Sequence, residues 1–305
     1  MTSRPNRSVP VVTQAVLSRK GAAKTADVPD DVRTLLNLGL IESANLCEWL
    51  IVDQLTLAEC VFSDAGWKHL LTDVRSELAA LKTPTAPKKI TAVAAVLNRG
   101  ITTRSERSIA LKVLMSHRSD IVRSWAALMI GNDDSLKFDA KLKQIRPLAA
   151  DENMGVREMA WMAIRSDVFN DPSRCITKLA DWTTERDARL RRFASEATRP
   201  CGVWCRHIPE LKQRPEMGLP ILQPLKSDES KYVRDSVANW LNDASKSRPD
   251  WVQELCSGWL KESSTQETRQ IVHRALRTLR KNSEQLAGEP AVQRSSRSAV
   301  KKTMR

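Results

Sequence analysis

The sequence predicts an all-α fold, a curved α-solenoid built from pairs of helices. Apolar residues recur at spacings of three and four along most of the chain, and few segments alternate with a period of two. The 305 residues are 41% hydrophobic, which is enough to bury a sizeable core, yet they include one Tyr and four Phe. A folded, helical protein is therefore expected.

A short motif that recurs along the chain predicts the repeat architecture. It is an arginine just inside an expected helix start, in most cases directly after an apolar residue, and polar or acidic residues suited to capping precede it. The intervals between these arginines are 34, 34, 43 and 35 residues, which fits two helices and two turns per HEAT-like repeat. We expect four or five repeats, marked by Arg123, Arg157, Arg191, Arg234 and Arg269.

Composition and helical pattern predict the order of segments along the chain. Prolines and basic residues mark both ends as disordered, and a Pro/Lys run separates an N-terminal group of helices from the repeats. The longest interval carries Pro200, Gly202 and Pro209, which predicts an enlarged loop. The expected segments are a disordered basic N-terminus (1–28), an N-terminal helical cap (29–82) with helices over 32–49 and 55–81, a linker (83–89), the HEAT-like solenoid (90–283) and a disordered basic tail (284–305).

The charge balance predicts a polyanionic partner. Forty-nine Lys and Arg face 36 acids, giving a formal charge of +13, so nucleic acid is the leading candidate. No stretch approaches the roughly 20 apolar residues of a membrane span, and the first thirty residues lack the apolar core of a secretory signal. We expect a cytoplasmic protein, nucleoid-associated if bacterial, with no membrane contact and no obligate protein partner.

The six cysteines are expected to be thiols, because they are widely spaced and an intracellular chain keeps them reduced. Cys201, Cys205 and His207 supply three soft ligands without a fourth nearby, so ordinary placement in a loop is favoured over a metal site. No metal and no cofactor are expected.

Numbering each repeat helix from its arginine separates a core face from a polar face. Positions +3, +4 and +7 share one side of a helix and are mostly apolar, as in Ala126, Ala127 and Ile130. Positions +1, +5 and +8 form a neighbouring polar stripe, and stacked repeats would align these stripes into one groove. Arginine suits phosphate through its planar fork, although arginines at a helical period can equally support a turn or solvate an outer face. The stripe and its flanks supply the expected DNA-binding residues Arg157, Arg165, Arg191, Arg192, Arg199, Arg234, Lys246, Arg274 and Arg277.

Carboxylates in a basic groove weaken binding to a polyanion, so their presence suggests chemistry. Cutting an N-glycosidic bond builds positive charge on the sugar, which a fixed carboxylate stabilises. We take Glu158, Glu196 and Asp243 as candidate catalytic residues and note Asp235 beside them, the alternative being pairing with a nearby arginine. An electron-rich ring can also hold a cationic base. The residues expected to contact such a base, the lesion in damaged DNA, are Trp161, Trp204, Asn239 and Trp240. Most of the nine tryptophans are nevertheless expected in a core.

Three stretches resemble the DNA alkylation-repair glycosylases of the AlkC/AlkD group, more closely the AlkC-type branch. They are Gly155–Trp161, Arg191–Pro200 and Tyr232–Lys246, and the segment Leu36–Asp53 is similar to the N-terminal pattern of that branch. The resemblance covers roughly residues 30 to 282, whereas the paired tryptophan and aspartate of the AlkD-type branch are missing. It implies a solenoid that holds duplex DNA and excises N3- or N7-alkylated purines without a cofactor. By the same resemblance, Glu158, Glu196, Asn239 and Asp243 lie near the lesion nucleotide.

Three functions remain open from the sequence. The first is a monofunctional glycosylase for cationic alkylpurines of the 3-methyladenine and 7-methylguanine type. The second is a noncatalytic binder of bent, branched or damaged DNA, since the family includes members thought to act in this way. The third is a protein-interaction scaffold, the commonest role of HEAT repeats, against which the arginines of the polar stripe argue.

Overall fold

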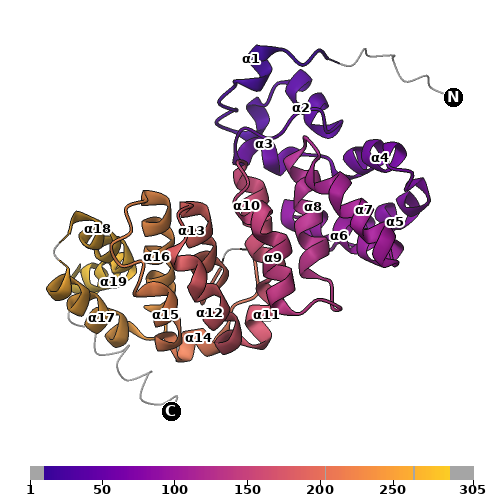
Figure 1. Ribbon diagram of the computed structural model, residues 1–305. Coiled ribbons are helices and arrows are strands. Elements are labelled where there is room, and N and C mark those ends of the chain that lie inside the picture. Colours follow the sequence, from indigo (N-terminus) through magenta and orange to yellow (C-terminus); the bar gives the residue numbers. More distant parts are fainter. Residues whose placement is uncertain (1–9, 203, 264, 289–305) are drawn as a thin grey trace. The chain divides into compact units, whose positions relative to one another are not determined.

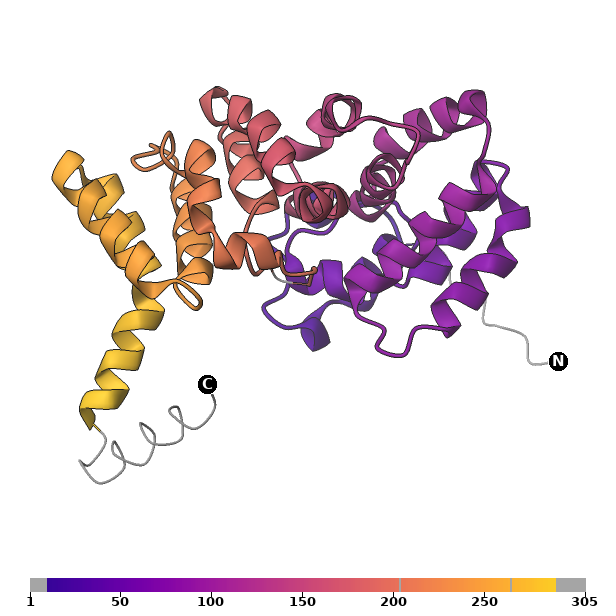
Figure 2. The ribbon, with the colours of Figure 1, turned by 90° about the horizontal axis from the view of Figure 1, so that it is seen from below.

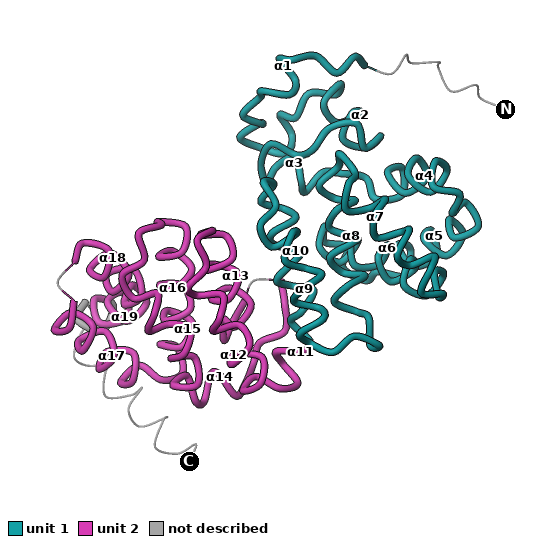
Figure 3. The backbone as a smooth tube through the Cα atoms, viewed as in Figure 1, with its two compact units in different colours: residues 1–166 teal, residues 167–305 magenta. Residues whose placement is uncertain are grey.

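A computed structural model describes residues 10–202, 204–263 and 265–288, and every regular element in these ranges is an α-helix or a short 3-10 helix. The all-α prediction is confirmed. The chain divides into two compact units, residues 1–166 and 167–305, which Figure 3 shows in different colours. Each unit is described below by itself. In the described ranges, no helix combines the length and the apolar character that a membrane crossing requires.

Unit 1 contains the N-terminal helices and the first repeat helices (Figure 1). Its elements are α1 (Gln14–Leu17), η1 (Thr25–Asp27), α2 (Asp30–Asn37), α3 (Leu46–Ile51), α4 (Gln54–Asp64), η2 (Lys68–Leu70), α5 (Leu71–Ala79), α6 (Ala86–Gly100), α7 (Arg104–Met115), α8 (Asp120–Gly131), α9 (Phe138–Ala149) and α10 (Met154–Ala163). The two long helices expected over 32–49 and 55–81 are each broken. Gly39 and Gly66 adopt positive φ angles of 73° and 79° at the breaks, a conformation that favours glycine.

Two expectations about irregular segments are wrong. From Pro10 onward the N-terminal segment is ordered against α3, because Arg19 forms a salt bridge with the buried carboxylate of Glu48 at 2.6 Å. Burial of that carboxylate requires a cationic partner, which composition alone does not reveal. The expected linker 83–89 ends inside α6, whose first turn accepts Pro87 because that position needs no amide donor. Residues 1–9 of the predicted disordered N-terminus lie outside the described ranges.

Unit 2 contains the later repeats and the chain that follows them. Its elements are α12 (Pro172–Ala180), η3 (Asp181–Thr184), α13 (Ala188–Ala197), α14 (Pro209–Gln213), η4 (Pro215–Gly218), α15 (Leu219–Leu222), α16 (Lys231–Ala244), α17 (Pro249–Glu262), α18 (Gln266–Ala275) and α19 (Arg277–Gly288), while α11 (Arg165–Asn170) crosses the boundary between the units. Helices α13, α16 and α18 pack side by side, and Figure 2 shows α19, in yellow, extending away from them. The expected tail begins inside α19, and its part from residue 289 lies outside the described ranges.

The core face predicted from the repeats is buried in four of the five repeat helices. Ala160, Trp161 and Ile164 on and beside α10 are at most 2% exposed, and the corresponding residues of α8, α13 and α16 are fully buried. The last repeat departs from the pattern, because His273 is exposed and Leu276 is half-buried. Helix α18 is the last helix of the row α13–α16–α18, so less of its surface is covered.

The polar residues expected to cap the repeat helices occupy their N-caps. Asn153, Asp187 and Thr265 accept hydrogen bonds from backbone amides in the first turn of α10, α13 and α18. Ser119 and Ser230 occupy the same position before α8 and α16, with no hydrogen bond from a first-turn amide to the side chain. The helix starts read from the sequence are therefore correct, and they fix the register of the two faces described next.

Candidate functional site

The repeat arginines hold the turn in front of their own helix. In four repeats the Nη1 group donates to the two carbonyl oxygens five and six residues earlier, at 2.6–3.0 Å. These arginines are Arg123, Arg157, Arg191 and Arg234. The guanidinium thus satisfies carbonyl groups that the turn would otherwise leave without a partner.

The rest of the guanidinium reaches the following repeat, either the turn before its helix or the helix itself. Arg123 binds both carboxylate oxygens of Asp151, Arg191 binds both oxygens of Asp228, and Nε of Arg234 donates to Gln270. Arg191 is only 8% exposed. We therefore assign Arg157, Arg191 and Arg234, which were expected to bind DNA, to the turns, and for Arg191 the expectation of a surface contact is wrong.

Where the polar sides of α13 and α16 meet lies a buried cluster that consists of Glu196, Arg199, Ser236 and Asp243, with Arg192 and Lys246 at its edge. Nη1 of Arg199 lies 2.6 Å from Oε1 of Glu196, while its Nε and Nη2 both donate to Oδ2 of Asp243. The hydroxyl of Ser236 donates to Oε2 of Glu196 at 2.6 Å. Lys246 donates to the remaining oxygen, Oδ1 of Asp243, at 2.9 Å. The cluster thus joins residues more than forty positions apart in the chain.

Both carboxylates of the buried cluster are fixed, and Glu196 is held ionised. Burial alone would raise the pKa of Glu196, but the charges of Arg192 and Arg199 and the hydrogen bonds from Ser236 and Arg199 outweigh it, so the pKa is lowered. The neighbouring carboxylates Glu196 and Asp243 in turn raise the pKa of Arg199 despite its burial. Arg199 is 8% exposed, so it orients the two carboxylates rather than offering an open phosphate contact.

More exposed cations surround the buried cluster on the same face of unit 2. The side chain of Lys246 is 49% exposed and that of Arg274 is 45% exposed. Arg192 stacks over the ring of Tyr232, 4.5 Å from its centroid, and lies 3.6 Å from Glu196. Arg277 on α19 donates to Oδ1 of Asn239 on α16. Within unit 2, ion pairs and hydrogen bonds therefore connect the predicted polar stripe of α13, α16 and α18, although its members Glu196, Arg199 and Asn242 are buried.

Two of the tryptophans expected to contact a lesion lie in the core. Trp240 is fully buried, donates to Thr198 and packs on Gly218, where an added Cβ would overlap its ring. Trp161 is 2% exposed and donates to Oε2 of Glu158 at 2.7 Å. The expectation is wrong for both, because neighbouring elements cover positions that helical periodicity leaves beside the polar face. Trp204, in contrast, is 51% exposed and adopts a positive φ of 60°.

The remaining candidates lie on α10 and at the start of α11, in unit 1. Glu158 is half-buried, with its carboxylate held by the Trp161 indole. Arg165 is only 4% exposed, so it lies beneath the surface on which a phosphate contact was expected. The alignment of Glu158 with the stripe of unit 2 in one continuous groove stays a prediction.

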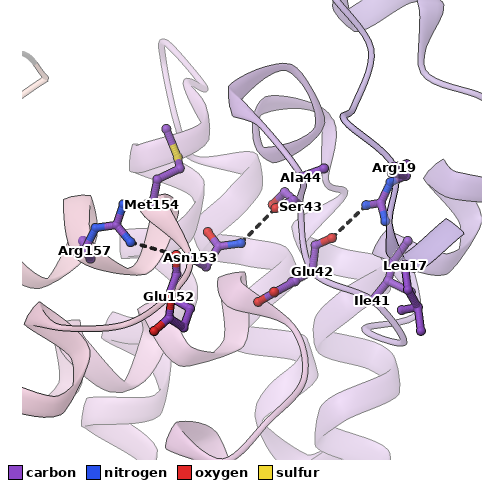
Figure 4. Close-up of a pocket in the computed structure, with 10 residues that line it drawn as sticks. All are labelled: Leu17, Arg19, Ile41, Glu42, Ser43, Ala44, Glu152, Asn153, Met154 and Arg157. Atoms are coloured by element: carbon purple, nitrogen blue, oxygen red, sulfur yellow. Dashed lines mark hydrogen bonds between the residues drawn. The ribbon is translucent and has the colours of Figure 1, made fainter. Parts of the chain in front are cut away.

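A cavity of about 340 Å³ in unit 1 lies between the N-terminal segment and the start of α10 (Figure 4). Its polar side chains are engaged in holding these parts together: Asn153 donates to the carbonyl oxygen of Ser43, Arg157 to that of Glu152, and Arg19 to that of Glu42. Its lining consists of Leu17, Arg19, Ile41, Glu42, Ser43, Ala44, Glu152, Asn153, Met154 and Arg157. We therefore treat it as the joint between the N-terminal helices and the repeats.

Three residues of the site escaped the sequence analysis. Ser236 and Tyr232 lie on α16 beside the polar stripe and complete the surroundings of Glu196 and Arg192. Asp228, one of the polar residues before the fourth repeat arginine, binds Arg191. An acid recurs six residues before a repeat arginine, at Asp151 and at Asp228. This recurrence is a sequence signal that could have identified Asp228 as a partner of Arg191. In the described ranges, no three His, Cys, Asp or Glu side chains are placed to hold a metal ion.

Comparison with known proteins places this geometry in a family. A model of the family described as DNA alkylation repair enzyme matches residues 72–279, more than half of the chain. The chain belongs to the DNA alkylation repair enzyme family. The match includes α13, α16 and α18 and therefore the whole buried cluster.

Individual relatives support the same placement. The chain is 39% identical over 125 residues to the uncharacterized protein YhaZ of Bacillus subtilis, a stretch that covers 41% of this chain and 34% of YhaZ. The chain therefore spans about a third of that curated relative. A structure of Pseudomonas fluorescens alkylpurine DNA glycosylase AlkC, bound to DNA containing an abasic site analog, is similar with a TM-score of 0.58 and 26% identity, over 74% of this chain and 60% of AlkC. AlkD2 from Streptococcus mutans shares the fold, with a TM-score of 0.54 and 22% identity over 68% of this chain and 96% of AlkD2.

Proposed function

We propose that this protein binds double-stranded DNA and hydrolyses the N-glycosidic bond of N3- or N7-alkylated purines. The observation that carries the proposal is the buried cluster, in which two fixed carboxylates lie within a cationic surface of a DNA alkylation repair family member. Similarity to AlkC, whose described activity is that of an alkylpurine DNA glycosylase, supports the substrate class.

The chemistry requires little proton transfer to the leaving group. Alkylation at N3 or N7 makes the purine cationic, so when the C1′–N9 bond breaks, the electron pair returns to the base and neutralises it. Positive charge develops on the sugar, where an ionised carboxylate such as Glu196, Asp243 or Glu158 would stabilise it. Water then adds to C1′ and releases one proton. The lowered pKa of Glu196 suits this electrostatic role, because the carboxylate stays charged at neutral pH.

The aromatic contact to the lesion is assigned to Trp204 in this proposal. Trp204 is 51% exposed, and it lies five residues after Arg199 in the chain, in the loop that follows α13. An indole face attracts a cationic base by cation–π interaction, worth about 0.5–2 kcal/mol. The phosphate contacts are assigned to the cations that remain at the surface of unit 2, Lys246, Arg274 and Arg277.

A base-release assay on methylated duplex DNA tests the proposal. Wild-type protein should release 3-methyladenine or 7-methylguanine, and Glu158→Gln, Glu196→Gln and Asp243→Asn should each slow release, by about a hundredfold for a residue that faces the sugar. Asp235→Asn is the matched control, because Asp235 lies on the same face with a more exposed side chain paired to Arg274 and Lys231. Circular dichroism checks that each variant is folded. No release by wild-type protein at any concentration rejects the glycosylase.

One observation favours a second function, the noncatalytic binding of bent, branched or damaged DNA. Every oxygen of Glu196 and Asp243 already accepts a hydrogen bond from Arg199, Ser236 or Lys246. Such carboxylates also serve simply to join α13 to α16. This function predicts tight, salt-sensitive DNA binding that survives the triple substitution Glu158→Gln, Glu196→Gln, Asp243→Asn, together with no base release.

A further inference from the structure

Arg277, at the first position of α19, is a positioned cation whose partners are neutral. Its Nη1 donates to the carbonyl oxygen of Arg274 at 2.8 Å, and its Nη2 donates to Oδ1 of Asn239 at 3.0 Å. Among the described residues, no carboxylate lies within salt-bridge distance of this guanidinium. Two hydrogen bonds thus fix the orientation of the side chain, while no described carboxylate binds the guanidinium directly.

The surroundings of Arg277 are predominantly cationic. Burial lowers the pKa of Arg277, the positive charges of Arg274 and Arg199 lower it further, and Asp243 opposes this change. Asp243 is already bound by Arg199 and Lys246, and Asp235 is shared between Arg274 and Lys231. Cations held close together repel one another, and a bound anion lowers the electrostatic free energy of the group.

The orientation of Asn239 follows from the chemistry of its partner. A guanidinium can only donate hydrogen bonds, so the amide atom that faces Arg277 must be the oxygen, Oδ1. The Nδ2 group then points elsewhere, and it donates to no acceptor in the described part of the chain. Asn239 is half-buried and therefore offers a bound molecule two donor hydrogens, with its acceptor already engaged.

We propose that Arg277 and Asn239 together bind one phosphate of the DNA backbone, so that Asn239 contacts a phosphate and not the lesion base. A phosphate oxygen accepts from both residues and supplies the negative charge that Arg277 lacks. A cationic alkylpurine at the same place would be repelled by Arg277, Arg274 and Arg199. The proposal rests on the proposed function for its DNA ligand and assigns Asn239 a role different from the lesion contact expected from the sequence.

Methylphosphonate scanning tests the phosphate site. A duplex with an abasic-site analogue is prepared in versions that each replace one backbone phosphate near the analogue with a neutral methylphosphonate, and the affinity of each version is measured. Wild-type protein should lose affinity at several positions. Arg277→Ala should bind the unmodified duplex about tenfold more weakly and become insensitive at one of these positions, with a salt slope smaller by about one. Asn239→Ala should lose part of its sensitivity at the same position.

Arg280→Ala is the matched control. Arg280 lies on the same helix three residues later, is exposed, and lines a surface pocket with Gln253 of α17 and not the face of α16. This variant should keep the wild-type profile. If Arg277→Ala keeps wild-type sensitivity at every phosphate, or Asn239→Ala weakens binding only when a methylated base is present, the proposal is wrong.

The outcome separates this site from the proposed function. A scan that identifies the position, together with no base release by wild-type protein, supports the phosphate site and rejects the glycosylase. Base release by wild-type protein, together with a scan that Arg277→Ala leaves unchanged, supports the glycosylase and rejects the phosphate site. If wild-type protein binds no duplex even at about 50 mM salt, where phosphate contacts are strong, both are rejected.

Discussion

Arg199, two residues beyond the end of α13, directs Nε and Nη2 at a single oxygen of Asp243 on α16, at 3.0 and 2.8 Å. The same guanidinium binds Glu196 through Nη1, so one arginine neutralises two carboxylates from two neighbouring repeats. All three side chains are at most 10% exposed. The loss of a partner has its largest effect on side chains that are buried this deeply.

Replacing Arg199 should destabilise the protein strongly. Arg199→Met keeps most of the side-chain volume but leaves Glu196 and Asp243 buried without their shared cation, which costs about 3–5 kcal/mol in the free energy of unfolding. Urea denaturation followed by circular dichroism measures the loss. Arg214→Met is the control, because Arg214 pairs with Glu210 at an exposed site and should cost less than about 1 kcal/mol. Equal losses for the two variants would contradict the role assigned to Arg199.

Asp120 should make the stability of unit 1 depend on pH between about 4 and 6. Burial raises the pKa of this carboxyl from 3.8 to about 6 in the folded chain, despite hydrogen bonds from Ser43. As pH rises through this window the unfolded chain loses the proton first, so the folded state is progressively disfavoured, by about 3 kcal/mol in total. Urea midpoints of wild type and Asp120→Asn are compared from pH 4 to 7. The difference between them should change in this window and stay level above it, and a constant difference would contradict the assignment.

Arg191 should contribute to stability and not to DNA binding. Arg191→Lys loses the two-oxygen contact with Asp228 and the bonds to the preceding turn, which we expect to cost about 3 kcal/mol. At a temperature at which the variant is folded, its affinity for duplex DNA should stay within about twofold of wild type, since less than half a kcal/mol is at stake. Fluorescence anisotropy with labelled duplex measures it. A large loss of affinity without a loss of stability would restore the original expectation of a DNA contact.

Two glycines inside helices should respond in opposite ways to alanine. In α8, a Cβ at Gly131 would overlap the carbonyl oxygen of Ala163, so Gly131→Ala should force α8 and α10 apart and cost about 1–3 kcal/mol. In α17, a Cβ at Gly258 meets nothing within 4 Å, so Gly258→Ala should stabilise the protein by up to about 1 kcal/mol. Thermal unfolding midpoints distinguish the two. Similar shifts would mean that the close packing of α8 on α10 is relieved without cost.

The fold was readable from the sequence wherever local pattern and packing agree. The spacing of the repeat arginines located α8, α10, α13, α16 and α18, and the capping residues located their starts. The pattern missed the breaks at Gly39 and Gly66, because a positive φ at a single residue leaves the apolar periodicity on both sides intact. It also missed the order of the N-terminal segment, which depends on one long-range ion pair between Arg19 and Glu48.

The candidate site was readable only in part. Periodicity grouped Glu196, Arg199 and Arg277 in one polar stripe, because it depends on helix geometry alone, but it could not show that Glu196 and Arg199 are buried. It misjudged Trp240, whose ring is covered by a different element, η4, at Gly218. It also misjudged Arg191, because an arginine that binds carbonyl oxygens of its own turn has the same spacing as one that faces a phosphate.

The contacts of the repeat arginines bear on how such a chain can change its length. Residues 228–262, whose length equals the 35-residue interval between Arg234 and Arg269, begin with an acceptor, Asp228, that receives Arg191 of the preceding repeat, and they contain a donor, Arg234, that reaches Gln270 in the following repeat helix. A tandem duplication of this block would supply each copy with an acceptor for the arginine of the repeat before it and with an arginine for the repeat after it. The new copy would therefore form these contacts without further substitution. An insertion between a repeat arginine and its acceptor can be accommodated in a loop, as in the 43-residue interval, whereas one that interrupts the turn itself would leave a guanidinium or a carboxylate without its partner.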